Sequence, residues 1–206
     1  MDLIFVRHAE PVRIDAVESG GRPVDPPLTE RGARQADLLA DWLAHERIDA
    51  VLSSPQRRAR ETAAPIARAH DLEVEIVDGI VEYDVQADHY IPVEELKAKR
   101  DPQWFAMIEG RWTDFGGDSP GEFRDRVVRS VDDIIDRFAG RRVVAVCHGG
   151  VINVAIAMIL GIDRLLWFDP HYTSVSRLVA SRDGVRSIVS LNERAHLEAE
   201  RRPRRA

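Results

Sequence analysis

An arginine and a histidine stand side by side near the start of the chain, directly after an apolar run. Residues 3–6 are all apolar, and Arg7 and His8 follow them. This pattern is typical of a buried strand that ends at the polar pair. Ligands of open α/β sheets bind at the carboxyl ends of the strands. Arg7 and His8 are therefore placed to meet an anion.

A second histidine ends a second apolar run far downstream. Residues 143–147 are apolar, His148 follows them, and Gly149 and Gly150 come next, before another apolar run. Glycine has no Cβ, so its N–H group can approach a ligand closely, and the start of a helix favours phosphate. We predict that two parallel strands bring two histidines to one sheet edge, where the ligand is a phosphate.

The composition narrows the classes of function. The chain has 206 residues, 44% of them hydrophobic, and a formal net charge of −6. This length predicts one domain over residues 1–206, and the charge argues against nucleic acid or a membrane surface as a partner. Cys147 is the lone cysteine, and the N-terminal residues show no signal-peptide pattern. We therefore expect a cytoplasmic protein without disulfide bonds.

The pattern along the chain predicts an α/β fold: a three-layer α/β/α sandwich around a mostly parallel sheet of about six strands. Residues 81–120 show no strong hydrophobic periodicity and are expected to form a helical insert over the active edge of the sheet. Asp183-Gly184 predicts a turn between two antiparallel strands that close the sheet. Residues 201–206 are rich in arginine and are expected to form a frayed tail. The expected strands cover residues 3–6, 50–52, 73–77, 143–147, 174–180 and 185–191, and the expected helices start near 29, 55, 122 and 149.

Several schemes for phosphate chemistry can be tested against the residues. A cysteine phosphatase needs an arginine six positions after its thiolate, and Asn153 occupies that position after Cys147. The Gly-Lys-Ser/Thr triplet of a P-loop does not occur. No spacing of Asp or His residues suggests a two-metal site. A metal-free histidine nucleophile remains.

Four blocks of sequence resemble the histidine phosphatase superfamily, the phosphoglycerate-mutase-like group. They occur in the order of that family, and together the resemblance extends from residue 3 to about residue 161. The blocks are residues 3–10, 27–32, 53–63 and 147–150.

The resemblance implies roles for the residues of the phosphate site. His8 is similar to the family's nucleophile, and Arg7, Arg58 and His148 match its phosphate-binding residues. Arg57 competes with Arg58 for the second arginine, but Arg58 directly precedes Ala59, as in the family pattern. Guanidinium groups can bind the non-bridging oxygens while a neutral imidazole attacks phosphorus.

The leaving alcohol must be protonated as it departs, which calls for a carboxylic acid on the far side of the phosphate. Glu82 lies where the family keeps that acid. Asp84 and Glu10 are the next candidates.

The chain also departs from the family pattern. Ile14 stands where mutases and many relatives have an asparagine that touches the phosphate, so Arg13 is a candidate replacement. Glu10 and Arg13 are accordingly expected to line a substrate pocket. The pattern that mutases use after the acid is missing downstream of Glu82-Tyr83-Asp84.

These departures favour a metal-independent phosphatase that hydrolyses a phosphomonoester through a phosphohistidine. The first alternative is a phosphoglycerate mutase, which would need 2,3-bisphosphoglycerate as a primer; otherwise no cofactor is expected. The second alternative is a module that binds a phosphorylated ligand without turnover. A phosphorylated small molecule is the expected partner.

Overall fold

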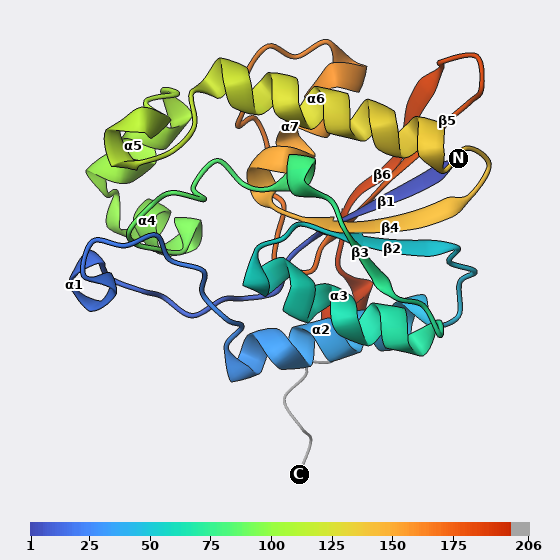
Figure 1. The fold of residues 1–206 in the computed structure, drawn as a ribbon, viewed down its shortest axis with the longest axis horizontal. Helices are drawn as coiled ribbons and strands as arrows, with labels where there is room; N and C mark the ends of the chain where they lie inside the picture. The colour runs from blue at the N-terminus through green and yellow to red at the C-terminus, as the bar shows by residue number, and fades with distance from the viewer. Residues whose placement is uncertain (199–206) are drawn as a thin grey trace.

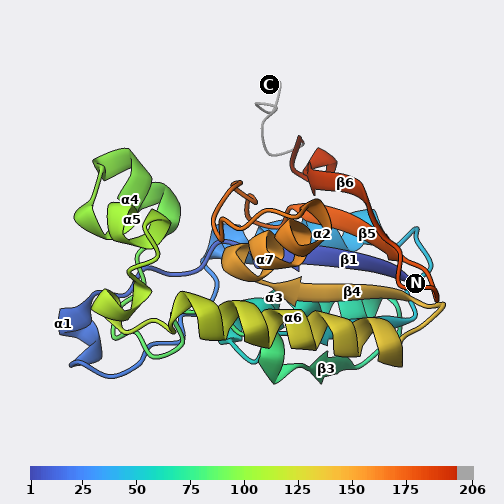
Figure 2. The same cartoon turned by 90° about the horizontal axis from the view of Figure 1, so that it is seen from above.

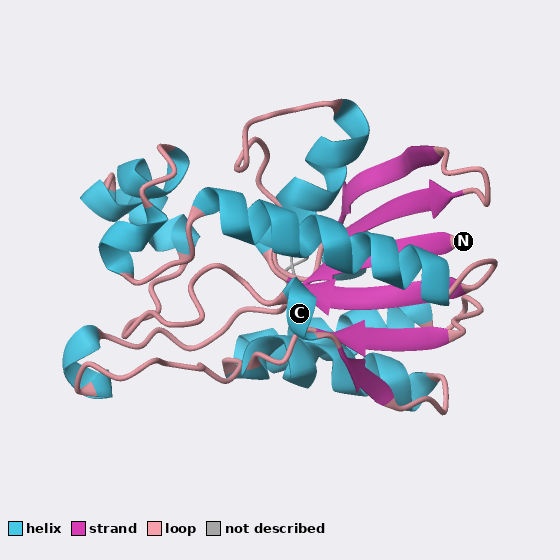
Figure 3. Ribbon diagram, turned by 45° about the horizontal axis from the view of Figure 1, so that its top comes forward, coloured by secondary structure: helices cyan, strands magenta, loops and turns pink. Residues whose placement is uncertain are grey.

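The structure, a computed structural model, describes residues 1–198 and is built on one six-stranded sheet with the strand order β3-β2-β4-β1-β5-β6. The four strands from β3 to β1 run parallel, and β5 and β6 are antiparallel to their neighbours (Figure 3). The predicted fold class and closing hairpin are confirmed. The strands are β1 (Asp2–Arg7), β2 (Ala50–Ser53), β3 (Val74–Ile76), β4 (Arg142–Cys147), β5 (Val175–Ala180) and β6 (Arg186–Glu193).

Helices cover both faces of the sheet and make the three layers. Figure 1 shows α2 (Glu30–Leu43) and α3 (Arg57–Ala69) on one face and α6 (Pro120–Arg137) and α7 (Gly149–Leu160) on the other. Successive residues of a strand face opposite sides of the sheet, so β1 and β4 contribute side chains to the hydrophobic core on each face. Ile4, Val6, Val144 and Val146 pack toward the first pair of helices, whereas Leu3, Phe5, Val143 and Ala145 pack toward the second. This double burial explains why both strands are continuous apolar runs.

Helix α3 begins later than predicted. The sequence suggested Pro55 as its first residue, but the helix starts at Arg57 with Gln56 as the N-cap. Gln56 is extended, and its N–H donates to Ser54 Oγ at 3.3 Å, so these residues form a turn. The side chain of Gln56 bonds the insert, which the local pattern of proline and serine could not reveal.

The insert and the loop after β1 lie beyond the carboxyl ends of β1 and β4 (Figure 2). The backbones of Ile14 and Tyr90 exchange two hydrogen bonds, which joins the loop, including α1 (Ala16–Ser19), to the insert. The predicted helical insert therefore stands over the active edge. Its elements are α4 (Val93–Lys99), α5 (Pro102–Ile108) and η2 (Trp112–Phe115), and η1 (Asp78–Ile80) directly precedes it.

The last described residues lie against the first helical layer. After β6, η3 (Ala195–Leu197) contacts α2, and the His196 ring stacks on Trp42 with 5.3 Å between the centroids. The predicted tail, residues 201–206, lies outside the described residues. Within residues 1–198, no helix combines the length and the apolar character needed to cross a bilayer.

Candidate active site

The two predicted histidines meet at the carboxyl edge of the sheet. β1 pairs in parallel with β4, and Arg7 lies opposite Cys147, so the residues that follow each strand are neighbours. The ring centroids of His8 and His148 are 5.1 Å apart. Both rings are buried, at 3% and 0% exposure. The sequence pattern of two strands ending in histidine thus forms one site.

The His8 ring is held in one tautomer. Nδ1 lies 2.8 Å from the backbone oxygen of Ala9. A carbonyl can only accept, so Nδ1 carries the hydrogen and Nε2 carries the free lone pair. Burial, together with the charges of Arg58 and Arg7, keeps the pKa of His8 well below its ordinary value. The imidazole is therefore neutral near pH 7, as a nucleophile requires.

The loop after His8 is fixed to the helix that carries the second arginine. The N–H of Ala9 donates to Thr62 Oγ1 at 2.9 Å, and that hydroxyl donates to the backbone oxygen of Arg58 at 2.7 Å. On the other side, a Cβ on Gly32 would lie 2.1 Å from the Glu10 backbone oxygen, so only glycine lets α2 approach this loop. These contacts tie His8 and Arg58 into one rigid unit.

Two buried arginines flank the histidines. Arg7 donates to the backbone oxygen of Pro170 at 2.6 Å, and its guanidinium carbon lies 4.0 Å from the centre of the Tyr172 ring. Arg58 pairs with Asp84 at 3.0 Å and lies over the Tyr90 ring at 4.7 Å. Ring stacking and ion pairs orient both planar groups. The expected choice of Arg58 agrees with this geometry, because Arg57 pairs with Glu61 on the outer surface.

Three buried nitrogens of this cluster have no hydrogen-bond partner among the described residues. They are Arg7 Nε, Arg58 Nε and His148 Nδ1. The other ring nitrogen of His148 contacts Ser54 Oγ at 2.8 Å. A buried polar atom without a partner is costly, so such a group in a native fold calls for an explanation. An anion with several acceptor oxygens would supply the missing partners.

Glu82 lies in the same cluster and is buried, at 7% exposure. Its Oε2 accepts from the N–H of Gly150 at 2.9 Å, and its own N–H donates to Gln56 Oε1 at 3.0 Å. Burial, followed by the charge of Asp84, raises the pKa of Glu82 to about 7. The carboxyl group can therefore hold a proton near neutral pH and release it, as a general acid and base must.

Gly150 has a different role from the one expected. The sequence suggested that its N–H would bind phosphate, but that N–H is donated to Glu82. A Cβ at this position would lie 2.4 Å from Glu82 Oε1, so the missing side chain makes room for the carboxylate. Gly149 precedes it and lines the cavity beside Arg7, where its expected contact with phosphate stays a prediction.

Glu10 and Arg13 point elsewhere. Glu10 pairs with Arg31 at 3.0 Å, and Arg13 pairs with Asp15 at 2.7 Å. Both line a second cavity, on the side of α2, and do not line the one that contains His8. The structure therefore does not bring Arg13 to the position that Ile14 leaves without a phosphate contact.

Glu94, from α4 of the insert, is a contact that the sequence did not suggest. Its Oε1 accepts from Arg7 at 2.7 Å, and its Oε2 accepts from the Tyr172 hydroxyl at 3.0 Å. The pair with Arg7 holds the pKa of Glu94 below its ordinary value despite partial burial. A carboxylate thus occupies Nη1 of the Arg7 guanidinium and would compete with a phosphate for its charge.

We expect Glu94→Gln to bind inorganic phosphate more tightly, because phosphate no longer competes with a carboxylate for Arg7. A partly exposed ion pair is worth roughly 1 kcal/mol, so the dissociation constant should fall about 2- to 10-fold. Isothermal titration calorimetry with inorganic phosphate measures this dissociation constant. Glu95→Gln is the control, because Glu95 pairs with Lys99 and Arg13; an equal change in both variants would contradict the competition.

Gln56 and Tyr172 were missed as positioning residues, and Asp84 was considered only as an acid, because these roles depend on contacts between segments that are distant in the sequence. Gln56 accepts a hydrogen bond from the backbone N–H of Glu82. Asp84 pairs with the Arg58 side chain, and the Tyr172 ring lies against the Arg7 guanidinium. Gln56 and Asp84 also bond each other at 3.2 Å. Among residues 1–198, no group of three or more His, Cys, Asp or Glu side chains is arranged to hold a metal ion.

The comparisons with known proteins agree with this geometry. The family model described as histidine phosphatase superfamily (branch 1) matches residues 3–194. The chain belongs to this superfamily. The expected resemblance is therefore confirmed, and it extends through the insert and the closing hairpin, where the four blocks gave no information.

Relatives of this histidine phosphatase include phosphoserine phosphatase 1 of Hydrogenobacter thermophilus, which is 32% identical over 198 residues, 95% of this chain and 93% of that protein. A probable phosphoglycerate mutase of Yersinia enterocolitica is 28% identical over 166 residues, 79% of this chain and 76% of that protein. Among solved structures, phosphoserine phosphatase from Entamoeba histolytica in complex with 3-phosphoglyceric acid superposes with a TM-score of 0.70. It is 25% identical, and the match covers 95% of this chain and 98% of that one.

Proposed function

We propose that this histidine phosphatase hydrolyses a phosphomonoester of a small molecule through a phosphohistidine at His8, without a metal ion or other cofactor. The observation that carries the proposal is the set of three buried, unpartnered nitrogens around the His8 ring, on Arg7, Arg58 and His148. The two arginine nitrogens supply the charge-assisted donors that a phosphoryl group needs. The names of the relatives support hydrolysis.

In the first step, Nε2 of His8 attacks phosphorus while the bond from phosphorus to the leaving oxygen breaks. Glu82 gives its proton to that oxygen, so a neutral alcohol departs. Arg7 and Arg58 bind the non-bridging oxygens, whose charge must be balanced in the transition state. The Nδ1–H bond to Ala9 stabilises the ring as it becomes positively charged.

In the second step, the Glu82 carboxylate takes a proton from water, and the oxygen of that water attacks phosphorus. The phosphorus–nitrogen bond breaks, inorganic phosphate leaves, and His8 returns to the neutral state. The same carboxyl group thus serves as acid and then as base, which its pKa near 7 allows.

The pH dependence follows from the same pKa values. The acid form of Glu82 exists below about pH 7 and is lost as the pH rises, whereas the lowered pKa of His8 keeps its ring neutral on the acid side. We expect kcat/KM for an alkyl phosphate to fall as the pH rises above about 7. The fall should be absent in Glu82→Gln; if it persists unchanged in that variant, another group is the acid.

The activity test uses an aryl phosphate in the presence of EDTA, beside inorganic phosphate release from a panel of phosphorylated metabolites. Full activity in EDTA is expected, and loss of activity that a divalent cation restores would contradict metal independence. Interconversion of 3- and 2-phosphoglycerate, with and without 2,3-bisphosphoglycerate, tests the mutase alternative. A mutase rate far above the hydrolysis rate would overturn the proposal.

Location in the cytoplasm is part of the proposal. Cys147 is free and buried beneath the site. Burial raises the pKa of its thiol well above the ordinary value, so the thiol stays protonated and takes no part in the chemistry.

A further inference from the structure

A cavity of about 300 Å³ opens directly above the phosphate site. Its floor includes His8, Arg58 and Glu82, and its walls come from the insert and from residues 164–170. Because Glu82 is placed to protonate the leaving oxygen, the leaving group of a bound substrate must extend into this cavity. The walls therefore select the alcohol.

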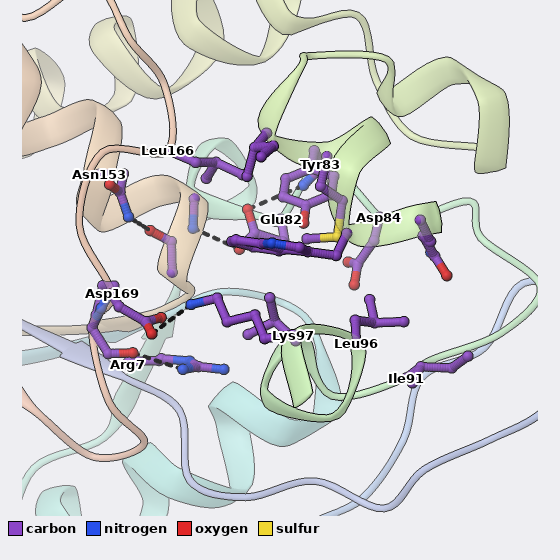
Figure 4. A pocket seen from close by; sticks show the side chains of 18 of the residues that line it. Arg7, Glu82, Tyr83, Asp84, Ile91, Leu96, Lys97, Asn153, Leu166 and Asp169 are labelled. Carbon is purple, nitrogen blue, oxygen red and sulfur yellow. Dashed lines mark hydrogen bonds and ion pairs between the residues drawn. The ribbon is translucent and has the colours of Figure 1, made fainter. Parts of the chain in front are cut away.

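The walls are mainly apolar. Figure 4 shows Ile91, Leu96 and Leu166 among the side chains that line the cavity. Burial of an apolar group against aromatic and aliphatic walls is favourable, whereas a sugar or an amino acid would gain few polar contacts there. Prominent wall residues are Ile91, Leu96, Trp104, Met107, Leu166 and Trp167.

Several polar groups in the walls are already engaged with one another. The Asn153 amide oxygen accepts from the N–H groups of residues 167 and 168 at 2.9 and 3.0 Å, and its nitrogen donates to the Gly149 and Phe168 carbonyls. His89 and Gln103 bond each other at 3.2 Å. A hydroxylated leaving group could not pair with Asn153, His89 or Gln103 without breaking these bonds, and that is costly.

Charge in the cavity also disfavours a second anion on the substrate. Lys97 is paired with Asp169 (Figure 4), and Arg58 is paired with Asp84. A substrate carboxylate that approached Lys97 or Arg58 would have to displace one of these carboxylates while lying close to the other. Arg164 also lines the cavity, but it is an exposed residue, so an ion pair between Arg164 and a substrate carboxylate would contribute little to binding.

We propose that the substrates are phosphomonoesters of apolar alcohols, aryl or medium-chain alkyl, and not phosphoserine or a phosphorylated sugar acid. This inference rests on the proposed phosphatase function and specifies its leaving group. The cavity is at the small end of the roughly 300–1,000 Å³ range of ligand pockets, which suits a single aryl group or a chain of several carbons.

The test compares substrates whose alcohols are of one chemical type. Ethyl and hexyl phosphate differ in length and hardly in leaving-group chemistry, and phosphoserine adds charge. We expect kcat/KM for hexyl phosphate to exceed that for ethyl phosphate by about 10- to 100-fold, and that for phosphoserine by at least as much. Equal or higher kcat/KM for phosphoserine would overturn the inference and leave the phosphatase function standing. Hydrolysis of none of them, nor of an aryl phosphate, would instead contradict the function itself.

Variants locate the preference in the cavity walls. Trp104→Ala should reduce the ratio of hexyl to ethyl kcat/KM by about 5- to 20-fold. Phe105→Ala is the matched control, since Phe105 is its exposed neighbour on α5 and does not line the cavity. Leu166→Ser tests the opposite wall, in case the tryptophan is needed for folding. An unchanged ratio in both cavity variants, with native circular dichroism spectra, would contradict the assignment.

Discussion

Replacing His8 with alanine is expected to lower kcat/KM for every phosphomonoester by at least about 10⁴-fold. The reason is that Nε2 forms the bond to phosphorus, and no neighbouring group can substitute. His148 is the nearest candidate, but its Nε2 contacts Ser54 and its ring is fully buried. Phosphate release from an aryl phosphate measures the loss, because that substrate needs no acid.

Two controls accompany this variant. His45→Ala removes an exposed histidine outside the site, and its kcat/KM should stay within about 2-fold of the wild-type value. Binding of inorganic phosphate to His8→Ala should persist, since Arg7 and Arg58 remain. Retained turnover in a folded His8→Ala protein would contradict the nucleophile assignment; lost turnover together with lost phosphate binding would indicate a wider structural defect.

Glu82→Gln is expected to have the second largest effect, and the effect should depend on the leaving group. An alkyl phosphate should lose about 10²- to 10⁴-fold in kcat/KM, because an alkoxide leaves poorly without a proton. Nitrophenyl phosphate should lose much less, because its phenolate leaves unaided. Glutamine has the shape of glutamate and can still accept a hydrogen bond from the N–H of Gly150. The comparison therefore tests the transfer of the proton separately from this structural contact.

Asp84→Asn is the matched variant for this test. Asp84 was the next candidate for the acid in the sequence, but in the structure it pairs with Arg58 and Gln56. The charge of Asp84 also raises the pKa of Glu82, so the comparison is made well below pH 7, where Glu82 stays protonated in both proteins. There the loss of Asp84 should lower kcat/KM for alkyl and aryl substrates alike, through the position of Arg58. If Asp84→Asn shows the dependence on the leaving group and Glu82→Gln does not, the roles of the two carboxylates must be exchanged.

The sequence predicts the core of the site because the relevant pattern is local. Each of two strands is a buried apolar run, and the polar residue that ends it must emerge at the carboxyl edge, so His8 and His148 follow from the strands alone. Arg58 and Glu82 were assigned by resemblance. The structure places all four around one buried cluster.

The remaining features depend on contacts between segments with no shared pattern. Glu94 reaches Arg7 across 87 positions of the sequence, and no local signal marks it. The side chain of Gln56 holds the Glu82 backbone, which also explains why α3 begins after Pro55. The apolar cavity likewise combines α4, α5 and residues 164–170, none of which has a strong period.

The phosphohistidine is the most direct test of the account. The protein is mixed with a phosphodonor labelled in its phosphoryl group, quenched in alkali within the turnover time, and digested for mass spectrometry. We predict one phosphoryl group on His8, stable in alkali and lost in acid, and none in His8→Ala. A label on another residue, or burst-free turnover with no labelled protein at any quench time, would contradict covalent catalysis by His8.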